Sequence, residues 1–333
     1  MIFPKKQLSA DEFTAQILAS NRYTLSQAIT LIESTRADHQ TLAGKVIEKC
    51  LPHSGNSIRI GISGTPGVGK SSFIESFGNQ VIKDGKKIAV LAIDPSSPIN
   101  RGSILGDKTR MARLTMQPNA YIRPTAAGGA LGGVARKTRE TIVLCEAAGF
   151  DVILIETVGV GQSETAVASM TDFFLLLLQP GAGDELQGIK RGIVEMADLI
   201  AVNKADGDHA ELAKQAQRAY ANALHLFPPK ENNWLPQAVC CSALSGFGIA
   251  DIWALILDYQ QFTQKNNYFQ TRRQSQAKYW LHESLKSAIV DVFFKNTTLQ
   301  SRLSEVENEV LEGKMSSFRA AEILTQLFVL QNK

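Results

Sequence analysis

The spacing of apolar residues changes twice along the chain. From residue 8 to residue 52, apolar residues recur at the three- and four-residue intervals of helices. Leu25, Ile29 and Ile32 fit one such stripe, and Leu42 and Val46 belong to another. Residues 52–56 contain proline and glycine, which interrupt helices. We therefore expect residues 1–56 to form a helical N-terminal extension.

Short apolar, β-branched runs replace the helical pattern after residue 57, and helix-like segments separate several of them. Strands that alternate with helices are typical of a mostly parallel sheet covered on both faces. The pattern predicts an α/β domain over residues 57–262, with ligands bound at the carboxyl ends of its strands. The expected strands are 58–62, 88–93, 152–155, 173–178, 199–202 and 238–241, and the expected helices are 72–83, 137–148, 210–226 and 249–261.

No strand pattern remains after residue 263, and the rest of the chain, 263–333, is expected to be helical. Helices are predicted over 276–294, 298–311 and 316–330, with Gly313 ending one of them. The apolar positions of this region allow two interpretations. The helices pack on the preceding domain, or they form a hairpin that dimerises.

Charge and cysteine content exclude several classes of protein. A net charge of +3 in 333 residues does not indicate a nucleic-acid partner or an anionic membrane surface. The longest apolar run, residues 173–178, is far too short to span a membrane. The four cysteines form no C-x-x-C pair, so we expect reduced, mostly buried thiols in a cytoplasmic protein.

A glycine-rich loop follows the first predicted strand and fits the pattern G-x-x-x-x-G-K-[ST]. Its glycines let backbone N–H groups approach phosphate oxygens, and the positive end of the following helix favours the same anion. Lys70 is expected to reach the β- and γ-phosphates, and the Ser71 hydroxyl to bind Mg²⁺. The domain is thus predicted to be a P-loop NTPase, and its phosphate-binding residues are Gly64, Thr65, Gly67, Val68, Gly69, Lys70, Ser71 and Ser72.

An N-K-x-D motif ends the strand at 199–202 and predicts selectivity for guanine. The Asp206 carboxylate can accept hydrogen bonds from guanine N1–H and N2–H₂, whereas adenine would leave this carboxylate unpaired. Lys204 is expected to lie along the base, and Asn203 to tie loops together. The backbone of Ser242, Ala243 and Leu244, after the last strand, is expected to contact guanine O6.

Acidic residues follow two further strands. Glu156 begins an E-x-x-G element in which the Gly159 N–H can sense the γ-phosphate. Asp94, Asp107 and Glu156 are candidate ligands of Mg²⁺ or of its waters, together with Ser71.

Several residues are candidates for orienting the attacking water. Gln162 is the nearest glutamine to the E-x-x-G element, and we expect slow turnover that a partner activates. The candidate catalytic residues are Lys70, Asp107, Glu156, Gln162 and Lys190, with Lys108 and Arg110 as further candidates for positioning water or stabilising charge.

Longer segments of the sequence resemble the MeaB/ArgK GTPases, the methylmalonyl-CoA mutase-associated proteins. The resemblance is carried by residues 102–111, 144–151, 156–164, 181–190 and 203–208, and it extends over nearly the whole chain. It implies a homodimeric GTPase that uses GTP, GDP and Mg²⁺. It also implies a chaperone that gates cofactor loading and protects an adenosylcobalamin-dependent acyl-CoA mutase, with residues 179–190 as an additional switch.

Two alternative functions stay open at this point. One is a nickel-delivery GTPase, which would need a Cys/His site, yet the five histidines are scattered. The other is a kinase or ATPase of lysine/arginine/ornithine transport, as an older name of the family implies. The N-K-x-D motif argues against ATP, and no kinase catalytic loop is present in the sequence.

Overall fold

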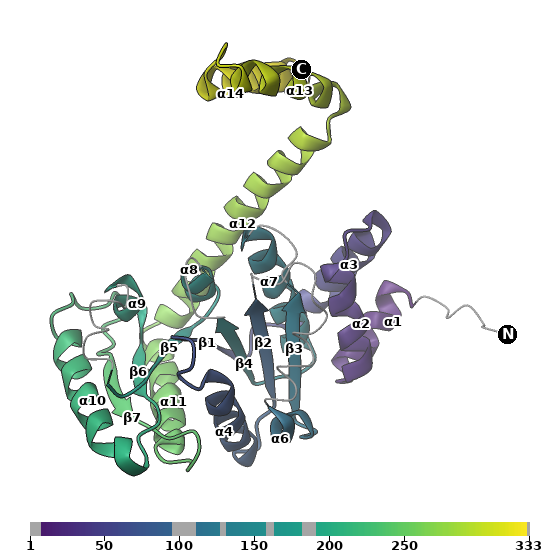
Figure 1. Ribbon diagram of the computed structural model, residues 1–333. Helices are drawn as coiled ribbons and strands as arrows, with labels where there is room; N and C mark the ends of the chain where they lie inside the picture. Colours follow the sequence, from purple (N-terminus) through teal and green to yellow (C-terminus); the bar gives the residue numbers. More distant parts are fainter. Residues whose placement is uncertain (1–7, 95–110, 127–130, 158–162, 182–190, 332–333) are drawn as a thin grey trace. The chain divides into compact units, whose positions relative to one another are not determined.

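A seven-stranded parallel sheet forms the centre of the computed structural model (Figure 1), which describes residues 8–94, 111–126, 131–157, 163–181 and 191–331. The strand order is β3-β2-β4-β1-β5-β6-β7. The order reverses beside β1, whose two neighbours are β4 and β5, and such a switch point is where open parallel sheets bind ligands. The strands are β1 (Ile58–Gly64), β2 (Ile88–Asp94), β3 (Ala120–Ala126), β4 (Val152–Thr157), β5 (Phe173–Leu178), β6 (Leu199–Val202) and β7 (Gln237–Cys240).

The sequence predicted every one of these strands except β3. This strand contains Arg123 and Pro124, which weaken the apolar pattern. Among the strands that the structure describes, β3 pairs with β2 alone and lies at the edge of the sheet. At an edge, proline removes no hydrogen bond from a central ladder.

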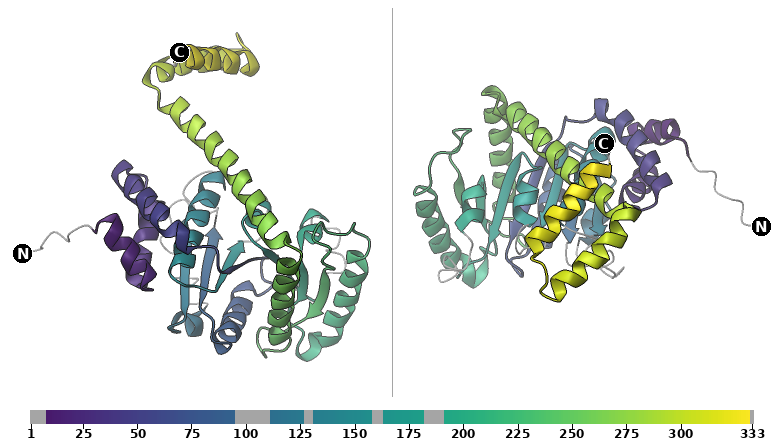
Figure 2. Two further views of the ribbon diagram at one scale, coloured as in Figure 1. Left: turned by 180° about the vertical axis from the view of Figure 1, so that it is seen from behind. Right: turned by 90° about the horizontal axis from the view of Figure 1, so that it is seen from above.

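The two faces of β1 carry different helices because successive side chains in a strand point to opposite sides. Ile60 and Ile62 are fully buried in a core that they share with Phe73 and Phe77 of α4 (Lys70–Lys83). Gly61 faces the other way, where a Cβ would lie 2.8 Å from Val167 in α8 (Ser163–Ala168). Helices thus cover both faces of the sheet (Figure 2).

The predicted helical extension is confirmed, and α2 and α3 pack against α7. The helices of this part of the chain also agree with the predicted segments, with additional short ones at α6, α8 and α9. Those not yet given are α1 (Ala10–Leu18), α2 (Arg22–Glu33), α3 (Ala37–Cys50), α6 (Ala112–Thr115), α7 (Leu131–Ala147), α9 (Arg191–Met196), α10 (Ala210–Leu224) and α11 (Ile249–Lys265).

All four cysteines are free thiols, as expected. Cys50, Cys145 and Cys241 are buried, and Cys240 is partly exposed. Burial raises the pKa of Cys241 to about 12, so this thiol is a poor nucleophile at neutral pH.

The chain divides into two compact units, Met1–Gln276 and Ala277–Lys333. The C-terminal helices are α12 (Tyr268–Lys295), α13 (Thr297–Leu311) and α14 (Ser317–Gln331). The three predicted helices are confirmed, although α12 begins at Tyr268 rather than at the predicted residue 276. Val306, Ala320 and Leu324 form the buried core of the second unit. No helix of the described residues is long and apolar enough to cross a membrane. The three-part division at residues 56 and 262 stays a prediction.

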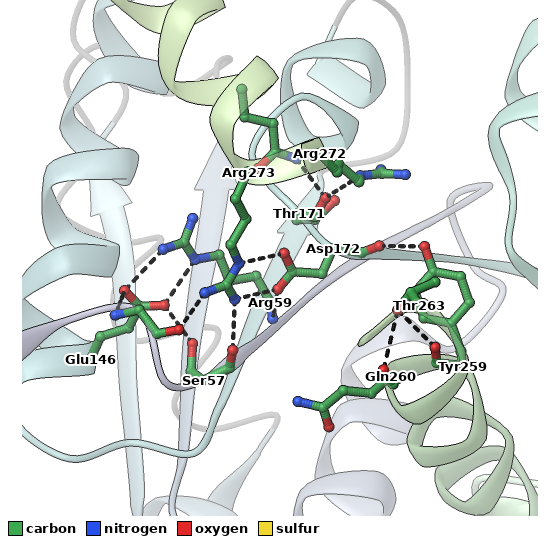
Figure 3. A network of polar contacts seen from close by, with 12 residues as sticks. Ser57, Arg59, Glu146, Thr171, Asp172, Tyr259, Gln260, Thr263, Arg272 and Arg273 are labelled. Carbon is green, nitrogen blue, oxygen red and sulfur yellow. Dashed lines mark hydrogen bonds and ion pairs between the residues drawn. The ribbon is translucent and has the colours of Figure 1, made fainter. Parts of the chain in front are cut away.

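An ion-pair network fastens the start of α12 to the amino ends of β1 and β5 (Figure 3). The Arg273 guanidinium donates to both carboxylate oxygens of Asp172, at 2.8 and 2.6 Å, and to the backbone carbonyl of Ser57 at 2.6 Å. Beside it, Arg59 donates to both oxygens of Glu146 at 2.9 Å. The network lies at the edge of the sheet opposite the glycine-rich loop, so it anchors helices without entering the candidate site.

Candidate functional site

The loop after β1 is closely fitted to its neighbours. Gly64 pairs with Leu177 of β5, and a Cβ on Gly64 would lie 2.4 Å from the Leu177 carbonyl oxygen. Gly69, the N-cap of α4, has φ +93°, and a Cβ there would lie 2.9 Å from the Asn203 side-chain nitrogen. Both positions therefore require glycine. The loop leads into the positive end of a 14-residue helix, which is the geometry of an anion site.

Lys70 lies folded over this loop. Its ammonium donates hydrogen bonds to the carbonyls of Gly64 at 2.6 Å and Thr65 at 3.2 Å. Burial lowers the pKa of Lys70, while the nearby carboxylates of Glu156 and Glu164 act in the opposite direction. The lysine is thus held at the loop by carbonyl dipoles and two acidic side chains.

Asn203 joins the glycine-rich loop to the loop after β7. Its side-chain nitrogen donates to the Val68 carbonyl at 2.9 Å, and its side-chain oxygen accepts from the Ala243 N–H at 3.0 Å. The side chain is buried, so replacing these partners with water would require opening the core. The expectation that Asn203 ties loops together is confirmed.

Asp206 and Lys204 lie around the same junction. The buried Ser242 hydroxyl donates to the Asp206 carboxylate and accepts from the Ser245 N–H. The Lys204 ammonium donates to the Gly67 carbonyl at 2.7 Å, which brings its aliphatic stem across to the glycine-rich loop. Leu244 is 92% exposed, so its side chain is accessible to a ligand at this junction.

These residues border one cleft of about 730 Å³, a volume typical of small-ligand sites. Of the predicted residues, the cleft is lined by Gly69, Ser72, Asn203, Lys204, Asp206, Ser242, Ala243 and Leu244. The remaining predicted loop residues, Gly64, Thr65, Gly67, Val68, Lys70 and Ser71, belong to the loop or the helix start beside it.

The candidate metal ligands are only partly described. Glu156 is buried in β4. It pairs with Ile62, which lies two residues before the end of β1. Asp94 ends β2 at the same edge of the sheet. A serine hydroxyl at position 71 and carboxylates at this edge are the hard oxygen donors that Mg²⁺ prefers. Asp107, Gly159, Gln162 and Lys190 lie outside the described residues. Within the described part, no three or more His, Cys, Asp or Glu side chains are grouped so as to hold a metal ion.

The cleft also contains residues that the sequence did not single out. Several of them lie on the polar side of α4. The spacing of polar residues within 72–83 could have predicted this face from the sequence. Arg113 comes from the start of α6, where its backbone N–H donates to Glu75 at 2.7 Å. The additional lining residues are Glu75, Ser76, Asn79, Lys83, Arg113, His209, Ser245 and Gly246.

Comparison with known proteins agrees with this arrangement. The model of the family described as methylmalonyl-CoA mutase-associated GTPase MeaB matches residues 25–298. GTPase ArgK of Escherichia coli is 43% identical over 95% of this chain and 97% of its own length. The mouse protein called methylmalonic aciduria type A homolog, mitochondrial, is 43% identical over 97% of this chain and 80% of its own.

A solved structure shares the fold. The crystal structure of an LAO/AO transport system kinase superposes with a TM-score of 0.75 at 35% identity, over 98% of this chain and 99% of that one. The family model and the relatives cover most of the chain, and the relative from Escherichia coli is named a GTPase. The chain therefore belongs to the MeaB family of methylmalonyl-CoA mutase-associated P-loop GTPases.

Proposed function

We propose that GTP binds in the cleft between the glycine-rich loop and the loops after β6 and β7, and is hydrolysed there to GDP and phosphate. The observation that carries this proposal is the position of Asn203, which is bonded to both the phosphate-binding loop and the predicted base-binding loop. One buried side chain thereby fixes the distance between the two parts of a nucleotide site. Preorganisation of this kind reduces the entropy lost when the ligand binds.

Asp206 is the residue proposed to select guanine. The Ser242 hydroxyl orients its carboxylate, and a carboxylate with one such bond still has lone pairs for two further donors. Guanine supplies two donors on one edge, whereas adenine supplies none in the same arrangement. Rejection of ATP then follows from leaving this carboxylate without partners.

Lys70 is proposed to stabilise negative charge on the β- and γ-phosphates as the bond to the γ-phosphoryl group breaks. Mg²⁺, held by Ser71 and by one or more of Asp94, Asp107 and Glu156, would neutralise part of the same charge when bound. Asp107, Glu156, Gln162 and Lys190 complete the proposed catalytic set. The Gly159 N–H is proposed to bind the γ-phosphate.

The cellular role is proposed to be that of a chaperone. GTP binding and hydrolysis would gate cofactor loading into an adenosylcobalamin-dependent mutase of the methylmalonyl-CoA mutase type and protect it from inactivation. Two observations support this role. The matching family is described as mutase-associated, and the mouse relative is named for methylmalonic aciduria.

The functional form is proposed to be a homodimer assembled through α12. Leu281, Leu285, Ile289 and Val292 recur at helical spacing on this helix, and each is more than half exposed. A continuous exposed apolar stripe of this kind marks an interaction surface. Sedimentation of Leu285→Asp should give a monomer. Leu226→Asp, which adds the same charge at an exposed leucine in the first unit, should leave the dimer intact.

Calorimetry on the full chain tests the nucleotide assignment. GTP and GDP should bind in the presence of Mg²⁺ and ATP should not. Lys70→Ala should abolish hydrolysis. Asp206→Asn should lower the affinity for GTP and GDP, and it should reduce the ratio of the GTP affinity to the ATP affinity. The exposed residues Lys45 and Asp258 provide matched controls, Lys45→Ala and Asp258→Asn. Equal affinity of the unmodified chain for ATP and GTP would contradict the proposal.

Transfer of adenosylcobalamin to a methylmalonyl-CoA mutase tests the chaperone role. Cofactor occupancy of the mutase should depend on whether this chain carries GDP or a non-hydrolysable GTP analogue, and Lys70→Ala should remove that dependence. Identical loading and identical inactivation rates with both nucleotides would exclude the role while leaving the GTPase assignment untouched.

A further inference from the structure

A second cavity, of about 230 Å³, lies between α2 and the edge strand β3 (Figure 1). This α2–β3 cavity shares no lining residue with the nucleotide cleft. It is smaller than the sites that hold drug-sized molecules, so it suits a ligand of only a few heavy atoms. The lining residues are Arg22, Tyr23 and Ser26 of α2, Thr115 of α6, and Tyr121, Ile122, Arg123 and Pro124 of β3.

Three hydroxyl groups of the cavity are already hydrogen-bonded within the protein. The Ser26 hydroxyl donates to the Arg22 carbonyl at 2.9 Å, and the Thr115 hydroxyl donates to the Met111 carbonyl at 2.8 Å. Tyr121 is 5% exposed, and its hydroxyl lies 3.0 Å from that of Ser26. Since the Ser26 hydrogen is used elsewhere, the tyrosine is the donor of this pair. The side-chain donors that remain for a ligand are therefore chiefly the N–H groups of the two arginines.

Both guanidinium groups have N–H donors to spare. Arg123 donates through Nη2 to Glu33 and, at 3.4 Å, to the Thr30 hydroxyl. Its Nε atom is buried and has no hydrogen-bond partner within the described residues. Arg22 makes one long bond, 3.4 Å from Nη1 to the Gln117 carbonyl, and no carboxylate of the described residues pairs with it.

The charges around the cavity favour an anion. Glu33 neutralises Arg123, whereas the charge of Arg22 has no such partner in the described part of the chain. None of the eight lining residues is acidic. A buried N–H group without an acceptor is costly, and the planar fork of a guanidinium matches the oxygen pairs of carboxylates and phosphates. An oxyanion would supply the acceptors that both arginines lack.

We propose that the α2–β3 cavity binds a small oxyanion, a carboxylate or a phosphate group with few or no carbon atoms attached, between Arg22 and Arg123. Arg123 is held in place by Glu33, whereas Arg22 is exposed at the mouth of the cavity and turns toward the anion. The bound anion joins the N-terminal helices to β3 and stabilises the folded chain according to its concentration. The inference does not depend on the proposed binding of GTP.

Calorimetry on the full chain tests this site, with inorganic phosphate and succinate as the two probes. Saturating GDP is present throughout, so that phosphate does not enter the glycine-rich loop. At least one probe should bind with a dissociation constant of about 1 mM or lower. Tighter binding of inorganic phosphate would identify a phosphate group as the ligand, and tighter binding of succinate a carboxylate.

Arg22→Gln removes one guanidinium without touching the pair of Arg123 and Glu33, so the probe should bind at least about ten-fold more weakly. Arg218→Gln is the matched control, because it removes the same charge from an exposed position of α10 and should leave the affinity unchanged. In NMR spectra of the arginine side chains, the Nε–H signals of Arg22 and Arg123 should shift as the probe is added.

Two results would overturn the inference. One is the lack of saturable binding of either probe, and the other is binding that Arg22→Gln leaves unchanged. Neither result would affect the proposed GTPase site, since GDP binding is measured separately in the same samples.

Discussion

The Asn203 side-chain amide donates a 2.9 Å hydrogen bond to the Val68 carbonyl, so the end of β6 is fixed to the glycine-rich loop. The same side chain accepts from Ala243 and receives a weak contact from the Cys241 thiol at 3.7 Å. Asn203 therefore supports both loops while it also lines the cleft.

Asn203→Ala should lower both stability and nucleotide affinity. The change leaves the buried Val68 carbonyl and Ala243 N–H without their partner, which we expect to lower the free energy of unfolding by roughly 2 to 4 kcal/mol. Affinity for GDP should fall at least about ten-fold, because the two loops are no longer held at a fixed separation. Urea denaturation and calorimetry measure the two effects. Asn308→Ala, at an exposed position of α13, is the control and should change neither.

Gly64→Ala should destabilise the protein and weaken GDP binding because the added Cβ has no room. The added Cβ would lie 2.4 Å from the Leu177 carbonyl oxygen, a backbone atom that cannot swing away. We expect a loss of roughly 2 to 3 kcal/mol in the free energy of unfolding, as in other overpacked cores, together with weaker GDP binding. Thermal unfolding with and without GDP would detect both changes.

Gly44→Ala is the matched control for this substitution. Gly44 lies inside α3, and its added Cβ meets nothing within 4 Å. Because alanine favours helix over glycine, this variant should be more stable by about 0.5 to 1 kcal/mol. If both glycine variants changed stability in the same direction, the steric account of Gly64 would be wrong.

Six of the strands and the main motifs could be predicted from the sequence because each motif follows a buried apolar strand. The N-K-x-D residues follow β6, and parallel strands place all such ends at one edge. The sequence also predicted that Asn203 joins the loops, since an asparagine side chain can donate and accept hydrogen bonds at once.

Other features could not be predicted because they depend on long-range packing. β3 was missed since Arg123 pairs with Glu33 of the N-terminal helices, and local hydrophobicity carries no trace of that contact. Glu164 reads as a surface residue of a short helix, yet it is buried where α8 packs on β1. Arg273 and Asp172 are about 100 residues apart, and nothing in the sequence indicates that they form a pair.

Tyr121→Phe should make the protein less sensitive to alkaline pH. Burial raises the pKa of Tyr121 to about 12 from its ordinary value of 10.0, although its hydroxyl lies 3.0 Å from that of Ser26. The unfolded chain therefore ionises first, and the native state loses stability as pH rises from about 10 toward 12. Over that range, ionisation of Tyr121 should lower the free energy of unfolding by roughly 3 kcal/mol. Phenylalanine does not ionise, so the variant should not show this loss.

Urea denaturation between pH 8 and pH 11 measures this effect. At pH 8, the free energy of unfolding of Tyr121→Phe should be about 1 kcal/mol below that of the native chain, because the variant lacks one hydrogen bond. This difference should shrink as pH rises. Tyr23 is 60% exposed, so Tyr23→Phe should follow the native curve throughout. Parallel curves for Tyr121→Phe and the native chain would show that Tyr121 titrates normally in the folded state.

Asp172→Ala should be the most destabilising of these substitutions. Asp172 is 1% exposed, and it accepts both Arg273 bonds and the Arg59 backbone N–H at 2.8 Å. The Arg273 side chain is 11% exposed, so removing the carboxylate leaves a largely desolvated guanidinium without its counter-charge. We expect this to lower the free energy of unfolding by roughly 3 to 5 kcal/mol. The exposed pair of Arg302 and Glu305 offers the comparison, since Glu305→Ala should change stability by less than about 1 kcal/mol.

Because the network lies at the sheet edge opposite the glycine-rich loop, any Asp172→Ala protein that remains folded should bind GDP with unchanged affinity. A weakened GDP affinity in that folded fraction would show that the anchor of α12 reaches the nucleotide site.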